Sequence, residues 1–217
     1  MREVDLLDQM PQPEKRIVGS RTIEHRIIAS YREREFFDGD RNCGYGGYVE
    51  DGRWGPVAER MIEYYKLKKG SRITQVNCEK GFLLQEFKKR GMTVVGFEPS
   101  KYARWCASPD LEIYEEPYQN VEGPDLLIAI GVIYTGSLKQ AIDDLREIEF
   151  CTFQSFITLA AYDNEEDLRL MRKWSLLGTT ILRKDEWIEV MKHANYTGDY
   201  SFVTAKTLKL CDPLGVF

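Results

Sequence analysis

The sequence has few of the residues that build metal sites and disulfide frameworks. Its five cysteines are far apart and form no CxxC pair, and it has only two histidines. This pattern argues against a zinc knuckle and a disulfide scaffold, and it fits a reducing compartment. We therefore expect no bound metal.

Long apolar runs and a basic tail are also missing. No stretch approaches the length of a membrane span, and acids and prolines stand near the N-terminus where an export signal needs an apolar core. Acidic residues outnumber basic ones by 35 to 30, and the two signs are mixed along the chain. We expect a cytoplasmic protein with neither a membrane nor a nucleic-acid partner.

The chain does have enough apolar material for one domain. It has 217 residues, 43% of them hydrophobic, which is enough to fill a sizeable core. We divide it into an N-terminal helical extension with a lid loop, residues 1–55, and an α/β domain, residues 56–217. The two parts are expected to form a single globular unit.

The N-terminal extension contains three patterns. Residues 1–12 are typical of a loose arm. In residues 14–34, the residues Ile17, Ile23, Ile27 and Ile28 recur at roughly helical spacing, which predicts one or two amphipathic helices. The segment from 36 to 54 is rich in glycine, aspartate and aromatic residues without a sustained period, which predicts an ordered loop or lid.

Beyond the lid the pattern alternates between helix and strand. A helix is predicted from Pro56 to about residue 67, with further helices at 81–90, 100–107, 138–148, 164–174 and 184–194. Strands are predicted at 72–76, 93–97, 111–114, 125–130, 153–160 and near 200–207, with one or two strands after the last helix. This order predicts a doubly wound, mostly parallel, Rossmann-like sheet that binds ligands beyond the carboxyl ends of its strands.

The segment from residue 72 to 103 places a strand, a turn, a helix, a second strand and an acid in the order that a nucleotide-type ligand requires. Glu98 ends the second strand, where its carboxylate could accept hydrogen bonds from both ribose hydroxyls of an adenosine. Gly81 and the N–H groups that open the helix could receive an anionic group. The alternative is an ordinary strand–helix–strand unit with a solvated acid.

This segment resembles motif I and the acidic strand end of class I S-adenosylmethionine-dependent methyltransferases. A wider resemblance to a bacterial, small-molecule-type subgroup covers about residues 30 to 207, on the segments Gly44–Tyr48, Asp51–Trp54, Lys80–Leu84, Asp185–Trp187 and Asn195–Phe202. The resemblance implies S-adenosyl-L-methionine as the cofactor. The residues it implies for cofactor binding are Val76, Asn77, Cys78, Glu79, Gly81, Glu98, Pro99 and Gly131.

The loop also departs from the family pattern of an acid, one residue and then Gly-x-Gly-x-Gly. Gln75, Asn77 and Glu79 replace the acid and the first two glycines, and Gly81 alone is kept. Side chains at 77 and 79 would intrude on the cofactor or force the loop onto a new path. Glu79 would bring a second negative charge toward the cofactor's carboxylate.

The remaining candidates for the site lie on the lid and after the fourth strand of the predicted sheet. Tyr45, Tyr48 and Trp54 offer flat faces for an adenine or an aromatic substrate, and Arg53 offers a grip on a carboxylate or phosphate. The alternative is that these aromatics staple the extension over the sheet. Tyr134 could orient a substrate but is a poor base at neutral pH. We predict Tyr45, Tyr48, Arg53 and Tyr134 as the catalytic-site residues.

Two functions follow, from different classes. The first is a small-molecule methyltransferase, and the second is a non-catalytic homologue that regulates or stabilises a partner protein through the extension or the insert at 163–183. A homo-oligomer, or a heteromer with a paralogous methyltransferase, would fit the second function. A nicotinamide-dependent dehydrogenase ranks below both because its glycine-rich turn is missing. A cavity ending at Glu98 and clear of Glu79 would favour the enzyme, and an exposed apolar patch on 14–35 or 163–183 would favour the partner-binding protein.

Overall fold

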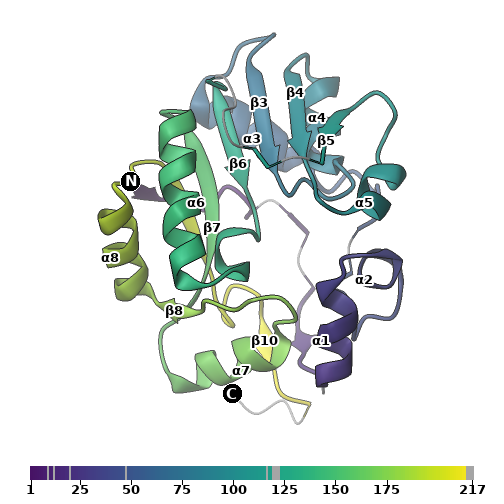
Figure 1. The fold of residues 1–217 in the computed structure, drawn as a ribbon, viewed down its shortest axis with the longest axis vertical. Coiled ribbons are helices and arrows are strands. Elements are labelled where there is room, and N and C mark those ends of the chain that lie inside the picture. The colour runs from purple at the N-terminus through teal and green to yellow at the C-terminus, as the bar shows by residue number, and fades with distance from the viewer. Residues whose placement is uncertain are drawn as a thin grey trace.

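The computed structural model describes residues 1–8, 10–11, 13–19, 21–46, 48–115, 117–118 and 123–213. An eight-stranded sheet runs in the order β1-β9-β7-β6-β3-β4-β5, with β8 paired to β7, and a two-stranded sheet joins β10 to β2 (Figure 1). The strands are β1 (Arg2–Glu3), β2 (Arg16–Ile17), β3 (Arg72–Val76), β4 (Thr93–Phe97), β5 (Glu112–Tyr114), β6 (Leu126–Ala129), β7 (Ser155–Tyr162), β8 (Leu182–Arg183), β9 (Asp199–Val203) and β10 (Leu210–Cys211).

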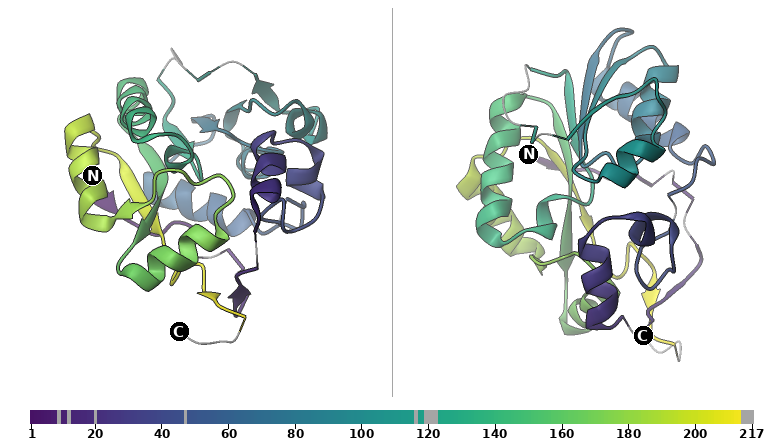
Figure 2. Two further views of the ribbon diagram at one scale, coloured as in Figure 1. Left: turned by 60° about the horizontal axis from the view of Figure 1, so that its bottom comes forward. Right: turned by 45° about the vertical axis from the view of Figure 1, so that its right-hand side comes forward.

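Helices flank both faces of the large sheet. In the right-hand view of Figure 2, α6 and α8 lie on one side of it and α3 and α4 on the other. The helices are α1 (Ile23–Ser30), α2 (Arg34–Asp38), α3 (Gly55–Tyr65), α4 (Phe82–Lys89), α5 (Lys101–Cys106), the 3₁₀ turn η1 (Ile133–Thr135), α6 (Leu138–Cys151), α7 (Glu165–Trp174) and α8 (Lys184–Ala194).

The strand order confirms the predicted doubly wound sheet. Counted from β3, the strands β3, β4, β5, β6, β7 and β9 occupy the order 3-2-1-4-5-6, and all strand pairings of the described residues are parallel. The order reverses between β3 and β6. In open parallel sheets the crevice at such a reversal, outside the carboxyl ends of the strands, is where ligands bind.

Strand β6 shows why a continuous apolar run suits this position. Leu126 and Ile128 belong to the core on the α3 and α4 side, whereas Leu127 and Ala129 belong to the core on the α6 and α8 side. Successive side chains of a strand point to opposite faces, so a strand covered by helices on both faces must be apolar at every position.

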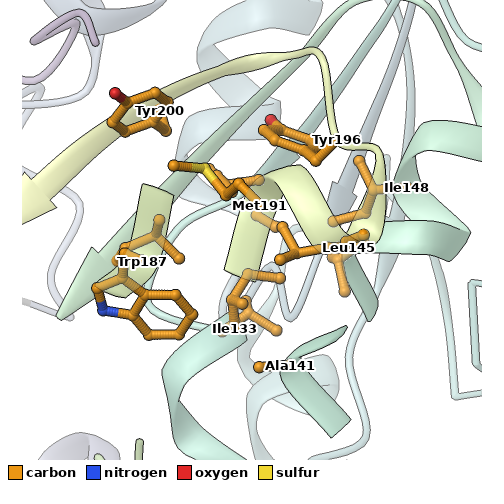
Figure 3. Close-up of a cluster of buried hydrophobic side chains, with 14 of the residues drawn as sticks. Ile133, Ala141, Leu145, Ile148, Trp187, Met191, Tyr196 and Tyr200 are labelled. Carbon is orange, nitrogen blue, oxygen red and sulfur yellow. The ribbon is translucent and has the colours of Figure 1, made fainter. Parts of the chain in front are cut away.

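The core between the sheet, α6 and α8 contains the large aromatic side chain of Trp187 (Figure 3). Trp187 is fully buried, and its indole N–H donates to the carbonyl oxygen of Ala160 at 2.8 Å. Met191 on the same helix and Leu145 of α6 are also fully buried in this cluster. The hydrogen bond satisfies the one polar atom of the indole, so the ring can be buried whole.

The first residues do not form the loose arm that their composition suggests. Arg2 and Glu3 pair with Asp199 and Tyr200 of β9, and the guanidinium of Arg2 bonds to the carboxylate of Asp199 at 2.9 and 3.0 Å. Leu6 is fully buried in the core beside α3. The arm is ordered because it covers the edge of β9, a partner almost 200 residues away that no local pattern reveals.

The isoleucines of the predicted amphipathic segment do not face the core. One helix, α1, forms within residues 14–34, while α2 starts at Arg34 and occupies the first residues of the segment predicted as a loop or lid. Ile23, Ile27 and Ile28 of α1 are 70%, 51% and 38% exposed, and Ile17 on β2 is 66% exposed. In α1 only Ala29 is buried. Helical spacing identified the helix correctly but could not tell which surface its apolar stripe meets.

Within residues 195–213, the part after α8 that the structure describes, the chain returns to the large sheet only once. Strand β9 pairs with β7 and β1, and β10 then pairs with β2 in the separate two-stranded sheet. One strand of the large sheet therefore follows the last helix. In the part of the chain that the structure describes, no helix has the length and apolar character to cross a membrane.

A pair of substitutions on α6 tests the core. Leu145 is fully buried, whereas Leu138 on the same helix is 44% exposed. We expect Leu145→Ala to lower the free energy of unfolding by about 2–5 kcal/mol, because it removes buried methyl groups and leaves a cavity. Leu138→Ala should cost much less. Chemical denaturation of both variants measures this, and equal losses would contradict the packing described here.

Candidate functional site

A cavity of about 290 Å³ lies at the switch in strand order. Asn77 and Gly131, which follow β3 and β6, line it, as does Val203 at the end of β9. Residues of α2, the lid and the end of α7 complete its wall. A second hollow of about 560 Å³, between α1 and α7, is lined by none of these strand-end residues.

The cavity brings together most of the predicted site. Eight of the twelve predicted residues line it: Tyr45, Tyr48, Arg53, Asn77, Cys78, Glu79, Gly131 and Tyr134. Val76, Gly81, Glu98 and Pro99 do not. The lid loop and the loop after β3, which are distant in sequence, therefore face one another across one space.

The loop after β3 has the left-handed backbone typical of a glycine-rich loop, although Asn77 and Glu79 stand where the first two glycines would be. Asn77, Glu79 and Gly81 have φ angles of 47°, 55° and 75°, all in the left-handed region. For a residue with a Cβ atom this conformation costs about 1–2 kcal/mol. Both Asn77 and Glu79 line the cavity while the backbone keeps this left-handed path.

Gly81 is required on two grounds. Its φ angle is left-handed, and a Cβ atom there would lie 2.6 Å from Cδ1 of Leu111. It also precedes the first residue of α4, with its carbonyl accepting the N–H of Gln85 at 2.9 Å. Gly81 thus shapes the turn from outside the cavity.

Glu98 lies directly after β4, as predicted, but its side chain reaches neither solvent nor the cavity. It is fully buried, with Oε1 accepting the N–H of Ser100 and Oε2 accepting the N–H of Glu79, both at 2.8 Å. The guanidinium of Arg32 contacts Oε2 at 3.4 Å. The expected cavity ending at Glu98 is not formed, because Arg32 and Glu79 line the space and Glu98 lies behind them.

Arg32 is a site residue that sequence reasoning missed. It occupies the turn between α1 and α2 with a φ of 50°, and its carbonyl accepts the hydroxyl of Ser100 at 2.5 Å. Its guanidinium carbon lies 5.6 Å from the ring centre of Phe36. Its buried Nε has no acceptor among the described residues. Nothing in the local sequence separates this arginine from its neighbours Arg26 and Arg34.

A second polar contact attaches α2 to the loop. The ammonium of Lys80, which is almost fully buried, donates to Oδ1 of Asp38 at 2.6 Å and to the carbonyl of Tyr48 at 3.1 Å. The hydroxyl of Tyr102 on α5 donates to Oδ2 of Asp38 at 2.7 Å. The extension is therefore attached to the loop after β3 and to α5 through Asp38 and the carbonyl of Tyr48.

The lid aromatics both line the cavity and attach the lid. The hydroxyl of Tyr45 accepts the N–H groups of Leu176 at 2.7 Å and Leu177 at 3.1 Å, and its ring lies 4.6 Å from that of Trp174. Tyr45 therefore attaches the lid to the chain after α7, as the alternative interpretation of the lid aromatics expected, and it also lines the cavity. The ring of Tyr48 is 5.0 Å from that of Phe37 on α2.

Arg53 forms an ion pair with Asp51 of the same loop. Its Nη2 lies 2.5 Å from Oδ2 of Asp51, and this hydrogen bond lowers the pKa of Asp51 to about 2. The Glu50 carboxylate instead lies 3.4 Å from the ammonium of Lys89.

Glu79 has the most perturbed carboxyl group of the cavity. Its removal from water raises its pKa to about 7, a rise that the charge of Glu98 adds to and that Arg32 and a hydrogen bond with Tyr48 oppose. Burial also raises the pKa of the Tyr134 hydroxyl far above neutrality. Glu79, rather than Tyr134, is therefore the group of this cavity that titrates near pH 7.

Gln75 leaves a buried acceptor facing the same space. It is 6% exposed and lines the cavity, and its Oε1 has no donor among the described residues. Such orphaned groups are rare in folded proteins because they lose water without gaining a partner. Together with Nε of Arg32, the cavity holds one unmatched acceptor and one unmatched donor.

Comparison with known proteins gives only distant matches. No protein-family model and no curated protein matches the sequence. The YcgJ protein from Bacillus subtilis matches with a TM-score of 0.49 and 12% identity, over 63% of this chain and 66% of that one. Human N-acetylserotonin methyltransferase, solved in complex with SAM, matches with a TM-score of 0.46 and 11% identity, over 66% and 50%. The mitomycin 7-O-methyltransferase MmcR matches with a TM-score of 0.44 and 12% identity, over 65% and 50%.

This chain spans less than two thirds of the length of each of those three structures. The fold assignment rests on the strand order and pairing of the chain itself.

The carboxyl group of Glu79 should make stability depend on pH. Its pKa is about 7 in the folded protein against an ordinary value of 4.5, so between these values the folded state holds the extra proton. Stability contributed by this proton is therefore lost as pH rises from 4.5 to 7. Between pH 5 and pH 8 we expect the wild type to lose roughly 1–3 kcal/mol of unfolding free energy relative to Glu79→Gln.

Chemical denaturation at several pH values measures this difference. Glu63→Gln is the control, because Glu63 is exposed on α3 and its replacement makes the same change in net charge. A constant difference between wild type and Glu79→Gln across this range would show that Glu79 titrates normally.

Proposed function

We propose that this chain binds S-adenosylmethionine and transfers its methyl group to a small molecule. The observation that carries the proposal is the loop after β3, where residues 77, 79 and 81 have left-handed backbone and the N–H of Glu79 donates to Glu98, the acid that follows β4. This loop opens on a cavity at the switch in strand order. The resemblance of the same segment to class I methyltransferases points to the same cofactor.

The carboxylate of Glu98 has capacity left for a ribose. Its two oxygens offer about four acceptor positions, of which the described residues use three. The contact with Arg32 is the longest of the three, at 3.4 Å. We infer that an adenosine reaches Glu98 when the side chain of Arg32 moves aside, because the two backbone donors need not change.

The orphaned atoms of the cavity suit the amino-acid end of the cofactor. Oε1 of Gln75 lacks a donor and Nε of Arg32 lacks an acceptor among the described residues, and both residues line the cavity. An α-ammonium group would satisfy the first and a carboxylate the second. Gln75 can therefore accept the hydrogen bond, although without the charge of the acid it replaces.

S-adenosylmethionine, when bound, supplies an electrophilic methyl group. The protein's part in a direct displacement is to align the acceptor and exclude water. The cavity can do this through its aromatic lining. Tyr45, Tyr48 and Trp54 contribute from the lid, Tyr134 from η1 and Trp174 from α7. We infer a small acceptor, because a cavity of about 290 Å³ has little room beside the cofactor.

A second candidate function is a non-catalytic homologue that binds a partner protein. The observation that favours it is the outer face of α1, where Ile23, Ile27 and Tyr31 follow one another at intervals of four residues and are 70%, 51% and 68% exposed. Side chains at this spacing form one stripe of a helix. Such a stripe suits a heteromer or a homo-oligomer and needs no catalytic site.

Cofactor binding tests the first candidate. We expect the wild type to bind S-adenosylmethionine with micromolar affinity in isothermal titration, and Glu98→Gln to weaken it at least about tenfold. The amide keeps the size of the side chain and one acceptor oxygen, but it loses the charge that strengthens each hydrogen bond. Glu112→Gln on the neighbouring strand β5 is the control, because Glu112 is exposed.

Each outcome separates the candidates. A wild type that binds no S-adenosylmethionine would overturn the first candidate, and sedimentation velocity should then show self-association or a complex that Ile27→Glu disrupts. Equal weakening by Glu98→Gln and Glu112→Gln would place the cofactor elsewhere. Thermal unfolding of each variant confirms that the protein is folded when titrated.

A further inference from the structure

Glu79 is the one acid among the described residues that line the cavity. The cationic side chains there have other principal partners. Lys80 pairs with Asp38, Arg53 with Asp51 and Arg32 with Glu98, while Arg16 donates to the carbonyl of Leu208 at 2.8 Å.

No lysine or arginine of the described residues lies within ion-pair distance of Glu79. Its side chain shares a hydrogen bond with the hydroxyl of Tyr48, a neutral group. The negative charge of Glu79 is thus compensated only at longer range, by Arg32 and Lys80. A cavity that holds such a carboxylate favours a positive charge on its occupant.

The aromatic lining supports the same polarity. The rings of Tyr45, Tyr48, Trp54, Tyr134 and Trp174 all line this cavity. Aromatic faces attract cations, including those without hydrogen-bond donors, through their quadrupole. A sulfonium has no N–H or O–H to donate, so aromatic faces and a nearby carboxylate are the groups that can recognise its charge.

We propose that Glu79 selects the charge on the cofactor's sulfur, so that the cavity binds the sulfonium S-adenosylmethionine in preference to the neutral thioether S-adenosylhomocysteine. This rests on the proposed function. The acid missing at position 75, in strand β3, is then replaced by one at position 79, in the loop that follows the strand. Loss of the positive charge on methyl transfer would weaken binding of the product and speed its release.

Several ionisable groups face Glu79 and set the pH at which this selection acts. They are Arg32 in the turn between α1 and α2, Lys80 and Cys78 in its own loop, Glu98 after β4, Tyr48 in the lid and Tyr134 in η1. Burial raises the pKa of Cys78, Tyr48 and Tyr134, so these three are neutral in this range. With a pKa of about 7, Glu79 is mostly protonated at pH 6 and mostly ionised at pH 8.

The test is the ratio of two affinities, measured by isothermal titration at pH 6 and pH 8. Both ligands carry the same adenosine and amino-acid groups and differ only in the methyl group and the charge it gives to sulfur. The contacts of the methyl group do not depend on pH, so the change of the ratio between pH 6 and pH 8 reports the charge. For the wild type, we expect the preference for S-adenosylmethionine to rise by about tenfold from pH 6 to pH 8, as the ionised fraction of Glu79 rises by that factor. Glu79→Gln should abolish the rise, whereas the charge-matched control Glu63→Gln should keep it.

Three results would overturn the assignment. A preference that does not change with pH, or one that changes equally in Glu79→Gln, would show that Glu79 does not select the sulfur charge, while binding itself would leave the proposed cofactor standing. A wild type that binds neither ligand at either pH would remove the proposed function and this inference with it. Sinefungin, whose amine replaces the sulfonium, repeats the measurement with a chemically stable cation and should follow S-adenosylmethionine.

Discussion

The buried carboxylate of Glu98 is the contact on which the site depends. It accepts the N–H of Glu79 in the loop after β3 and the N–H of Ser100 at the start of α5, and it meets Arg32 from the extension. A carboxylate without water is tolerated only when its oxygens are matched in this way. One side chain thus joins three segments that are separated in sequence by up to 68 residues.

The same carboxylate explains how the loop after β3 keeps its shape without glycines at positions 77 and 79. Left-handed backbone at Asn77 and Glu79 is unfavourable for residues with a Cβ atom. The hydrogen bond from the N–H of Glu79 to Glu98 holds the loop in that path, and the N–H of Cys78 donates to the carbonyl of Phe97 at 3.0 Å. The strain is local, and the contacts that offset it come from the neighbouring strand.

The extension takes part in the site rather than lying beside it. Arg32 and Asp38 reach Glu98 and Lys80 from opposite ends of the short helix α2. Figure 1 shows α1 and α2 near α5 and α7, at the end of the sheet where β7 leads into α7. The outer stripe of α1 remains exposed. The extension therefore contains both residues that line the cavity and the apolar surface on which the second candidate function rests.

The alternation of strands and helices was determined by the sequence alone. Arg72–Val76, Thr93–Phe97 and Lys184–Ala194 have the bounds that their patterns predict, because period, caps and glycines act over a few residues. The placement of Glu98 at a strand end follows from the same local signals. Five of the predicted residues that line the cavity follow β3 or β6, and they meet because the carboxyl ends of parallel strands share an edge. The three on the lid are brought there by the tertiary fold.

Tertiary structure decided what those residues contact. The pairing of Arg2 with Asp199, the approach of Arg32 to Glu98 and the attachment of Lys80 to Asp38 join positions 197, 66 and 42 residues apart. No local pattern encodes such a partner. The outward stripe of α1 was missed for the same reason, since helical spacing shows that a helix has an apolar face but the surface it meets depends on the rest of the fold.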